Sequence, residues 1–237
     1  MTNHTADVSP NKTARVAGLL YLSLVPLSLF GLLSVSPLLV PGDAATTAKN
    51  ILASETLFRL SSVSALIVQV LNIFVVLALY RLLKPVNKIM AALMVVFFLA
   101  GVPIAMLNEL NYFAILLLLN GPDYLTLFTV NQVQALVPLF LDLHQHGINI
   151  AGIFWGLWLF PMGYLVFKSG FLPRILGILL MIGCLGYLVD SFSAFLLPTA
   201  EVKIAMFTFW GEVLFPLWLL IKGVNVEQWK KRALESA

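Results

Sequence analysis

Long apolar runs alternate with short polar segments along most of the chain, and this pattern predicts membrane-spanning helices. Each run has about 20 or more residues, which at ~1.5 Å per residue is enough to cross a hydrocarbon core of ~30 Å. The ten-residue alternation of a membrane β-barrel is not seen. We therefore expect an all-α polytopic transmembrane helix bundle with six spans, at about residues 15–38, 56–83, 88–119, 145–168, 173–197 and 200–223.

The composition also indicates a lipid environment. The 237 residues are 60% hydrophobic and 11% charged, with a mean hydropathy of +0.97, whereas soluble domains have about 25% charged residues. A folded domain of this size cannot hide so much apolar surface from water. The net charge of +3 does not suggest a nucleic-acid partner, and the single cysteine, Cys184, has no partner for an intrachain disulfide.

The basic residues predict the orientation in the membrane. With six spans, three of the 14 Lys and Arg residues fall on one side, namely Lys49, Arg59 and Lys203, and the other eleven fall on the opposite side. The positive-inside rule then places both termini in the cytoplasm of a multi-pass protein of the bacterial plasma (inner) membrane. The expected organisation is a cytoplasmic tail at 1–12, a transmembrane domain at 13–224 and a basic cytoplasmic tail at 225–237.

Two segments between spans predict short helices on the outer face. Residues 43–55 begin with Asp43, which can cap a helix, and have a modest apolar face. Residues 121–143 contain no Lys or Arg. A seventh span there would place the basic turn after the fourth span and the basic tail on opposite sides. We therefore expect 121–143 to lie on the outer face or to dip into it.

Polar residues within the spans predict a site. A charged side chain at the centre of a membrane helix costs roughly 2.5–3.5 kcal/mol on insertion scales, so such residues mark functional positions. Seven of them fall at mid-depth or nearer the outer face and are expected to form one outward-facing pocket: Arg59, Glu109, Asp142, His144, His146, Asp190 and Glu212. All except His144 are candidate ligand-binding residues. The alternative is a set of separate pairs that reach the outer interface.

The stretch Leu141–Asn149 contains two of the three histidines. On a helix His144 and His146 point about 200° apart, whereas Asp142, His146 and Asn149 share one face. We therefore expect Asp142 to pair with His146, and His144 to point elsewhere. A metal site formed by His144, His146 and Asp142 would require a non-helical backbone, which Gly147 permits.

Five separated motifs resemble a known family. They are VPGDAATTAKNILASETLFR (40–59), LDLHQHG (141–147), SGFLPRILG (169–177), GYLVD (186–190) and LWLLIKG (217–223). Over about residues 13–224 the chain resembles a family of bacterial polytopic membrane proteins catalogued as a domain of unknown function. The resemblance implies a bundle of six to seven helices, and it supplies no activity, substrate or cofactor.

Three functions remain open from the sequence. The first is binding or moving a small or lipidic ligand or an ion at the outer pocket, within the lipid bilayer. The second is a metal-dependent intramembrane hydrolase, although neither H-E-x-x-H nor G-x-S-x-G is found. The third is a structural or regulatory membrane subunit. No cofactor is expected, except zinc under the second alternative, and the sequence indicates neither enzymatic activity nor an oligomeric state.

Overall fold

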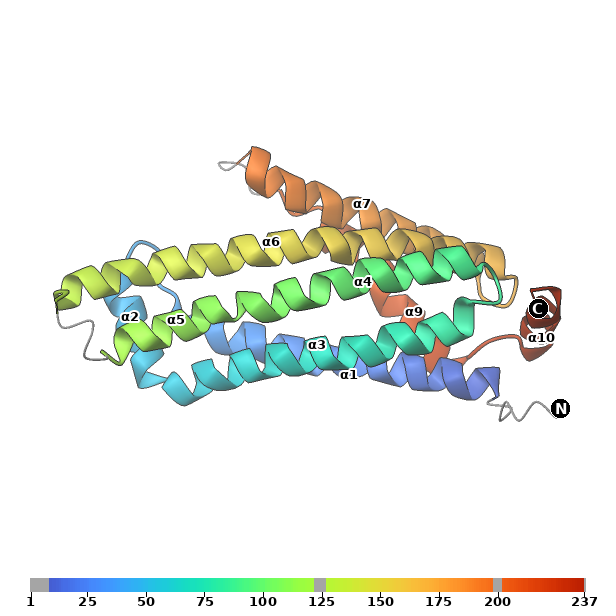
Figure 1. Cartoon of the computed structure of the whole chain (residues 1–237), viewed down its shortest axis with the longest axis horizontal. Helices are drawn as coiled ribbons and strands as arrows, with labels where there is room; N and C mark the ends of the chain where they lie inside the picture. The colour runs from blue at the N-terminus through green and yellow to red at the C-terminus, as the bar shows by residue number, and fades with distance from the viewer. Residues whose placement is uncertain (1–8, 122–126, 198–201, 237) are drawn as a thin grey trace. The chain divides into compact units, whose positions relative to one another are not determined.

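The computed structural model describes residues 9–121, 127–197 and 202–236, and within these ranges every regular element is a helix (Figure 1). The helices in chain order are α1 (Pro10–Val35), the 3₁₀ turn η1 (Ser36–Leu38), α2 (Ala44–Ala53), α3 (Glu55–Leu83), α4 (Lys88–Asn108), α5 (Leu110–Leu119), α6 (Val130–Ser169), α7 (Arg174–Leu196), α8 (Ala205–Thr208), α9 (Trp210–Ile221) and α10 (Val226–Glu235). The expected all-α class is confirmed.

Five helical segments are long and apolar enough to cross a membrane: Pro10–Leu38, Glu55–Leu83, Lys88–Leu119, Val130–Ser169 and Arg174–Leu196. Large apolar side chains are exposed along them, including Leu19, Leu33 and Leu185. A helix surface of this kind requires lipid as its solvent. The chain is therefore a multi-pass membrane protein, and the first three predicted spans and the fifth closely match observed helices.

The predicted sixth span is divided. Residues 200 and 201 lie outside the described residues, and the remainder forms α8 and α9, which run from Ala205 to Ile221. At ~1.5 Å per residue this segment is about 25 Å long, somewhat less than a full hydrocarbon core. It counts as a sixth span only together with α10, from which it is bent by 104°.

The fourth span is longer than predicted. Helix α6 has 40 residues and is continuous from Val130 to Ser169, a length of about 60 Å. Residues 130–143 of the predicted segment 121–143 are not a separate helix, because they continue the helix of the fourth span; that they lie on the outer face stays a prediction. Residues 122–126 of that segment lie outside the described residues. Val137 is fully buried, so packing holds this part of α6 in place.

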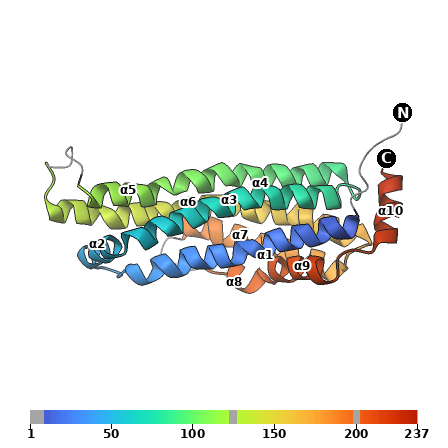
Figure 2. The same ribbon diagram turned by 90° about the horizontal axis from the view of Figure 1, so that it is seen from below.

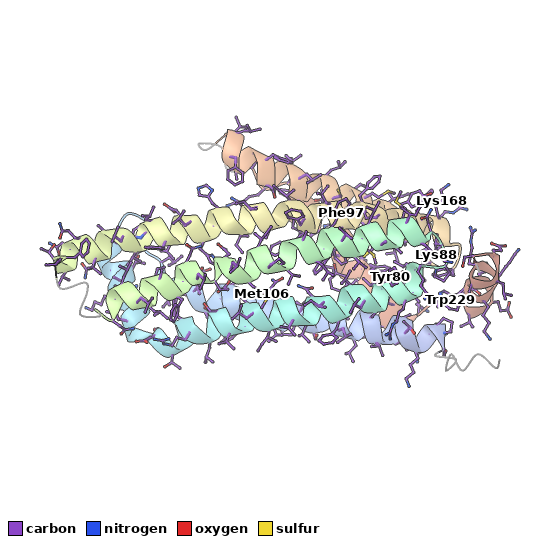
Figure 3. All side chains as sticks on the ribbon, in the orientation of Figure 1. Tyr80, Lys88, Phe97, Met106, Lys168 and Trp229 are labelled. Carbon is purple, nitrogen blue, oxygen red and sulfur yellow. The ribbon has the colours of Figure 1, made fainter. Side chains whose placement is uncertain are left out.

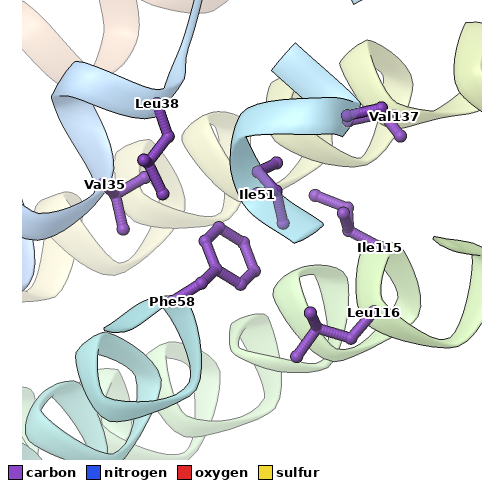
Figure 4. Close-up of a cluster of buried hydrophobic side chains, with 8 residues drawn as sticks. Val35, Leu38, Ile51, Phe58, Ile115, Leu116 and Val137 are labelled. Carbon is purple, nitrogen blue, oxygen red and sulfur yellow. The ribbon is translucent and has the colours of Figure 1, made fainter. Parts of the chain in front are cut away.

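Contacts divide the chain into two compact units. Unit 1 comprises Met1–Ser23, Leu71–Ala100 and Gly152–Ala237, and unit 2 comprises Leu24–Val70 and Gly101–Ala151. Unit 2 has a buried apolar cluster built from α1, η1, α2, α3, α5 and α6 (Figure 4), with the members Val35, Leu38, Ala48, Ile51, Phe58, Ile115, Leu116 and Val137. Helix α2 enters this cluster through Ala48 and Ile51. Its predicted cap is confirmed, because Asp43 Oδ1 accepts the Thr46 backbone N–H at 2.8 Å.

Small residues allow close helix packing in unit 1. A Cβ atom placed on Gly163 would lie 2.6 Å from the Gly177 carbonyl oxygen, and one on Gly156 would lie 2.9 Å from the Tyr187 Cβ. Helices α6 and α7 thus approach each other backbone to backbone, as small-residue motifs in membrane helices permit. Gly170, at φ +75°, follows the end of α6, and Pro173 precedes α7, which agrees with the predicted turn at SGFLP.

At one end of unit 1, hydrogen bonds tie the chain around α10 to α1, α3 and α6. Asn11 Oδ1 accepts the Val224 backbone N–H at 2.8 Å. The Trp229 indole N–H donates to the Leu82 carbonyl at 2.8 Å, and Arg232 Nη2 donates to the Lys168 carbonyl at 3.2 Å. Helix α10 therefore lies across helix ends (Figures 1 and 2), and Lys88, Lys168 and Trp229 lie at this same end (Figure 3). The starts of α1 and α4 and the ends of α3, α6 and α9 meet there.

Candidate functional site

A buried acid and a buried histidine meet in unit 2. Glu109 Oε1 lies 3.3 Å from His144 Nε2, and each residue is only 9% exposed. Within the described part of the chain, the second carboxylate oxygen, Glu109 Oε2, is buried and has no hydrogen-bond partner. A buried acceptor without a partner costs about 1–3 kcal/mol. Native proteins keep such an unpaired oxygen where it has a function or where a small ligand donates the missing hydrogen bond.

Glu109 occupies a break between two helices. Helix α4 ends at Asn108 and α5 begins at Leu110, and the Glu109 backbone N–H donates to Met106 three residues earlier rather than four. Pro103 lies one and a half turns before the break and cannot donate a backbone hydrogen bond. Counting from Lys88, Glu109 is about 30 Å along the helix. The predicted third span is still one apolar helical segment, Lys88–Leu119, with a local irregularity at its acidic residue.

Amide side chains hold the histidine segment against the break. Asn108 Nδ2 donates to the His144 carbonyl oxygen at 2.8 Å, and Asn111 Nδ2 donates to Asn108 Oδ1 at 3.0 Å. A Cβ atom on Gly147 would overlap the Asn108 side chain. Gly147 therefore makes room for Asn108 on a continuous helix, and the non-helical backbone that a two-histidine metal site would need is not formed.

Aromatic side chains cover the histidine. The rings of Tyr112 and His144 are stacked, with centroids 3.7 Å apart and an interplanar angle of 16°. Tyr112 in turn packs against Phe58 with a centroid distance of 4.8 Å. The imidazole is therefore enclosed by aromatic rings on the side away from solvent.

A second buried carboxylate lies in unit 1. Tyr21 Oη donates to Glu212 Oε2 at 3.1 Å, and the Tyr187 side chain is close enough to Glu212 to interact with it electrostatically. Glu212 Oε1 is buried and has no hydrogen-bond partner among the described residues. Counting back from Lys222, Glu212 lies about 15 Å along the helix. Here a carboxylate meets phenols rather than a base.

Two of the predicted site residues have local partners. Arg59 pairs with Glu55 one turn away, with Nη2 at 2.6 Å and Nε at 2.7 Å from Glu55 Oε1. Asp190 accepts the backbone N–H groups of Ile204 and Ala205 at 2.6 Å and 2.9 Å. Asp190 therefore caps the start of α8 from the side of α7. That one pocket holds all seven predicted residues stays a prediction, since Asp190 and Glu212 belong to unit 1 and the others to unit 2.

The histidine assignment from the sequence is corrected. Asp142 and His146 are exposed, whereas His144 is buried against Glu109, so His144 points away from the other two, as expected. What differs is the inward face, which carries His144 and not Asp142 and His146; the pairing of Asp142 with His146 stays a prediction. The buried positions Val137, His144, Ala151 and Trp158 follow one another at intervals of seven, which places them on one face of α6. Extending the helix back to residue 130 would have revealed this face. Among the described residues, no group of three or more His, Cys, Asp and Glu side chains is arranged to hold a metal.

Sequence reasoning missed the aromatic partners of the two acids. Tyr112 lies three residues after Glu109, on the same face, so helical spacing could have identified it. Tyr21 offers a weaker signal, since it is a lone phenol in an otherwise apolar span. No local pattern links it to Glu212, which is 191 residues away.

Two cavities are found whose walls do not include the two buried acids. A cavity of about 490 Å³ in unit 2 is lined by Glu55, Arg59, Phe113, Leu116, Leu117 and Asn120. A cavity of about 340 Å³ in unit 1 is lined by Ser169, Gly170, Gln228, Lys231, Arg232 and Glu235. Neither is lined by Glu109, His144 or Glu212.

The comparisons with known proteins supply a family and no activity. A family described as a domain of unknown function (DUF4386) matches residues 16–223. An uncharacterized protein of Archaeoglobus fulgidus is 34% identical over 168 residues, which cover 71% of this chain and 86% of the relative. No solved structure matches significantly.

Proposed function

We propose that this chain, which belongs to the DUF4386 family of unknown function, is a membrane protein that binds and releases a proton at Glu109 and His144. Of the functions expected from the sequence, this is the first, the binding of a small ligand or ion, with a proton as the ion. The proposal rests on one observation: a nine-tenths buried carboxylate has one oxygen 3.3 Å from an imidazole nitrogen and the other oxygen without a partner among the described residues.

The pair suits proton exchange because each member can carry the proton. A carboxylate and an imidazole within hydrogen-bond reach pass a proton between them without moving far. When one proton is bound, the pair is neutral overall, whether it is written as a carboxylic acid with imidazole or as a carboxylate with imidazolium. Loss of that proton leaves one negative charge in a buried site. A buried charge without a counter-charge raises the electrostatic free energy of the folded protein.

The helix break gives this charge change a structural consequence. Interrupted membrane helices leave backbone groups that respond to an ion at the break. The Asn108 side chain connects the end of α4 to the His144 backbone on α6. We expect a change in the charge of the pair to alter the contact between the break and α6.

Infrared difference spectroscopy tests the proposal. Purified protein in lipid is cycled between acidic and alkaline buffer, and the carboxyl band of a buried acid is recorded. Wild type is expected to show a band that disappears in Glu109→Gln and shifts in His144→Gln. Glu227→Gln, which removes a carboxylate from α10, is the matched control and is expected to keep the band. A Glu109→Gln spectrum identical to that of wild type would refute proton binding at this site.

We further propose that both termini lie on the cytoplasmic side of the plasma membrane. Eleven of the 14 basic residues support this orientation, and so does the contact of Asn11 with Val224 at one end of unit 1. Leu127 and Leu234 are exposed and can be replaced by cysteine, because the native Cys184 is buried. In intact cells, a membrane-impermeant maleimide is expected to label Leu127→Cys and not Leu234→Cys. The reverse labelling pattern would contradict the orientation.

A further inference from the structure

The cavity of about 490 Å³ in unit 2 combines an ion pair with an apolar wall. Glu55, Arg59 and Asn120 provide the polar side, and Phe113, Leu116 and Leu117 provide the apolar side. Its volume falls in the range of small-molecule sites, ~300–1,000 Å³. We propose that this cavity binds a zwitterionic phospholipid of the surrounding bilayer, with the headgroup at Glu55 and Arg59 and an acyl chain along the apolar wall.

The ion pair leaves hydrogen-bonding capacity on both charges. Glu55 Oε1 accepts hydrogen bonds from Arg59 Nη2 and Nε and from Asn120 Nδ2, the last at 3.4 Å. Among the described residues, Glu55 Oε2 and Arg59 Nη1 have no such contact. The side chains of Arg59 and Glu55 are 47% and 31% exposed. Both charges are therefore accessible to a headgroup.

The neighbouring opposite charges favour a zwitterion over a singly charged ligand. A guanidinium binds phosphate oxygens through charge-assisted hydrogen bonds, and a carboxylate accepts from an ammonium group. An anionic headgroup such as phosphoglycerol meets Arg59 but is repelled by Glu55. A phosphoethanolamine headgroup provides a partner for each, because its phosphate and ammonium are a few bonds apart.

The apolar wall determines the kind of molecule that carries the headgroup. Phe113 and Leu117 are on α5 and are 49% and 42% exposed, and they lie beside the ion pair in the same cavity. A hydrocarbon chain on this wall removes from water the apolar surface of about two large side chains. This burial adds to the affinity whatever the headgroup is. A phospholipid satisfies both sides of the cavity at once. Lipid binding at this cavity is expected whether or not Glu109 and His144 bind a proton.

Native mass spectrometry of the purified full-length protein tests the inference. The delipidated protein is titrated with phosphatidylethanolamine, phosphatidylglycerol and diacylglycerol. Wild type is expected to bind phosphatidylethanolamine at least tenfold more tightly than the other two. Arg59→Gln is expected to lose most of that preference, and Glu55→Gln to gain affinity for phosphatidylglycerol. Leu117→Trp fills the apolar side and is expected to weaken all lipid binding at the site.

Matched controls come from the same unit. Lys49→Gln removes an exposed cation of α2, and Leu110→Trp adds bulk to an exposed position of α5 outside the cavity. Both are expected to bind as wild type does. Equal binding of the three lipids, or wild-type binding by both Arg59→Gln and Leu117→Trp, would overturn the inference. Circular dichroism of each variant establishes that it is folded, and the opposite effects expected for Arg59→Gln and Glu55→Gln cannot arise from unfolding.

Discussion

Glu109 in unit 2 and Glu212 in unit 1 are both buried acids on apolar helices, and each has one oxygen without a hydrogen-bond partner among the described residues. Their partners differ. Glu109 meets His144, a base that can accept and carry a proton, whereas Glu212 meets Tyr21, which donates a hydrogen bond and remains neutral. Under the proposed proton exchange, the difference lies in the partner, because Glu109 has a base within hydrogen-bond reach and Glu212 has a phenol.

The largest effect is expected from His144→Leu, which leaves both oxygens of Glu109 buried without a partner. The free energy of unfolding should fall by about 3 kcal/mol, as when one member of a buried pair is removed. Unfolding in mixed detergent micelles, followed by tryptophan fluorescence, measures this loss. Asp142→Asn, at an exposed position of the same helix, is expected to stay within about 0.5 kcal/mol of wild type.

The double variant Glu109→Gln/His144→Leu sharpens this test. It removes the charge together with its partner, so it should lose less stability than the sum of the two single variants. If the losses of unfolding free energy in the two single variants add up to the loss in the double variant, Glu109 and His144 are not coupled. Glu109 would then have no basic partner, as is the case for Glu212.

A smaller effect is expected from Tyr21→Phe, which removes the hydrogen bond to Glu212 Oε2. The loss in unfolding free energy should be about 1.5 kcal/mol, the value for a bond to a charged acceptor. Glu212→Gln keeps an acceptor oxygen for Tyr21 and should cost less. Tyr80→Phe is the control, since no hydrogen bond of its hydroxyl is found among the described residues. If Tyr21→Phe also abolished the infrared band assigned to Glu109, the two acids would not be independent.

The smallest effect concerns an exposed acid of unit 2 that titrates outside the spans. Hydrogen bonds from the Thr46 side chain and backbone lower the pKa of Asp43 from its ordinary value of 3.8. The cap therefore stabilises α2 fully above that value, and its contribution is lost as the pH falls through the lowered pKa of the folded state. Asp43→Asn should flatten this acid-induced loss in a pH series of melting temperatures. An unchanged slope in the variant would assign the acid sensitivity to another group.

The membrane class and most helix positions could be predicted because hydropathy is a local property. The spans at 56–83 and 88–119 match the observed ends of α3 and α5 closely. The distribution of basic residues favours an outer-face location for residues 130–143 and does not indicate that they continue the helix of the fourth span. The burial of Val137 in the unit 2 cluster keeps this part of α6 in the helix, and packing of this kind is not visible in a local pattern.

The candidate site was predictable in part. The residues Asn108, Glu109 and Asn111 could be recognised as polar positions in an apolar span, and the structure places them around one helix break. Helical spacing separates His144 from Asp142 and His146, but it does not show which of the two faces is buried; that depends on the packing of α6 against Glu109. The hydrogen bond between Tyr21 and Glu212 joins residues 191 positions apart, a separation that helical periodicity cannot bridge.

The hydrogen bond between Asn11 and Val224 has a consequence for how the protein is made. All segments of unit 2 have been synthesised once residue 151 is added, whereas unit 1 also needs segments that follow it. The part of α1 that belongs to unit 1 is synthesised about 200 residues before its partners Glu212 and Val224. Unit 1 can therefore close only after unit 2 is complete in sequence, and until then this part of α1 lacks both hydrogen bonds.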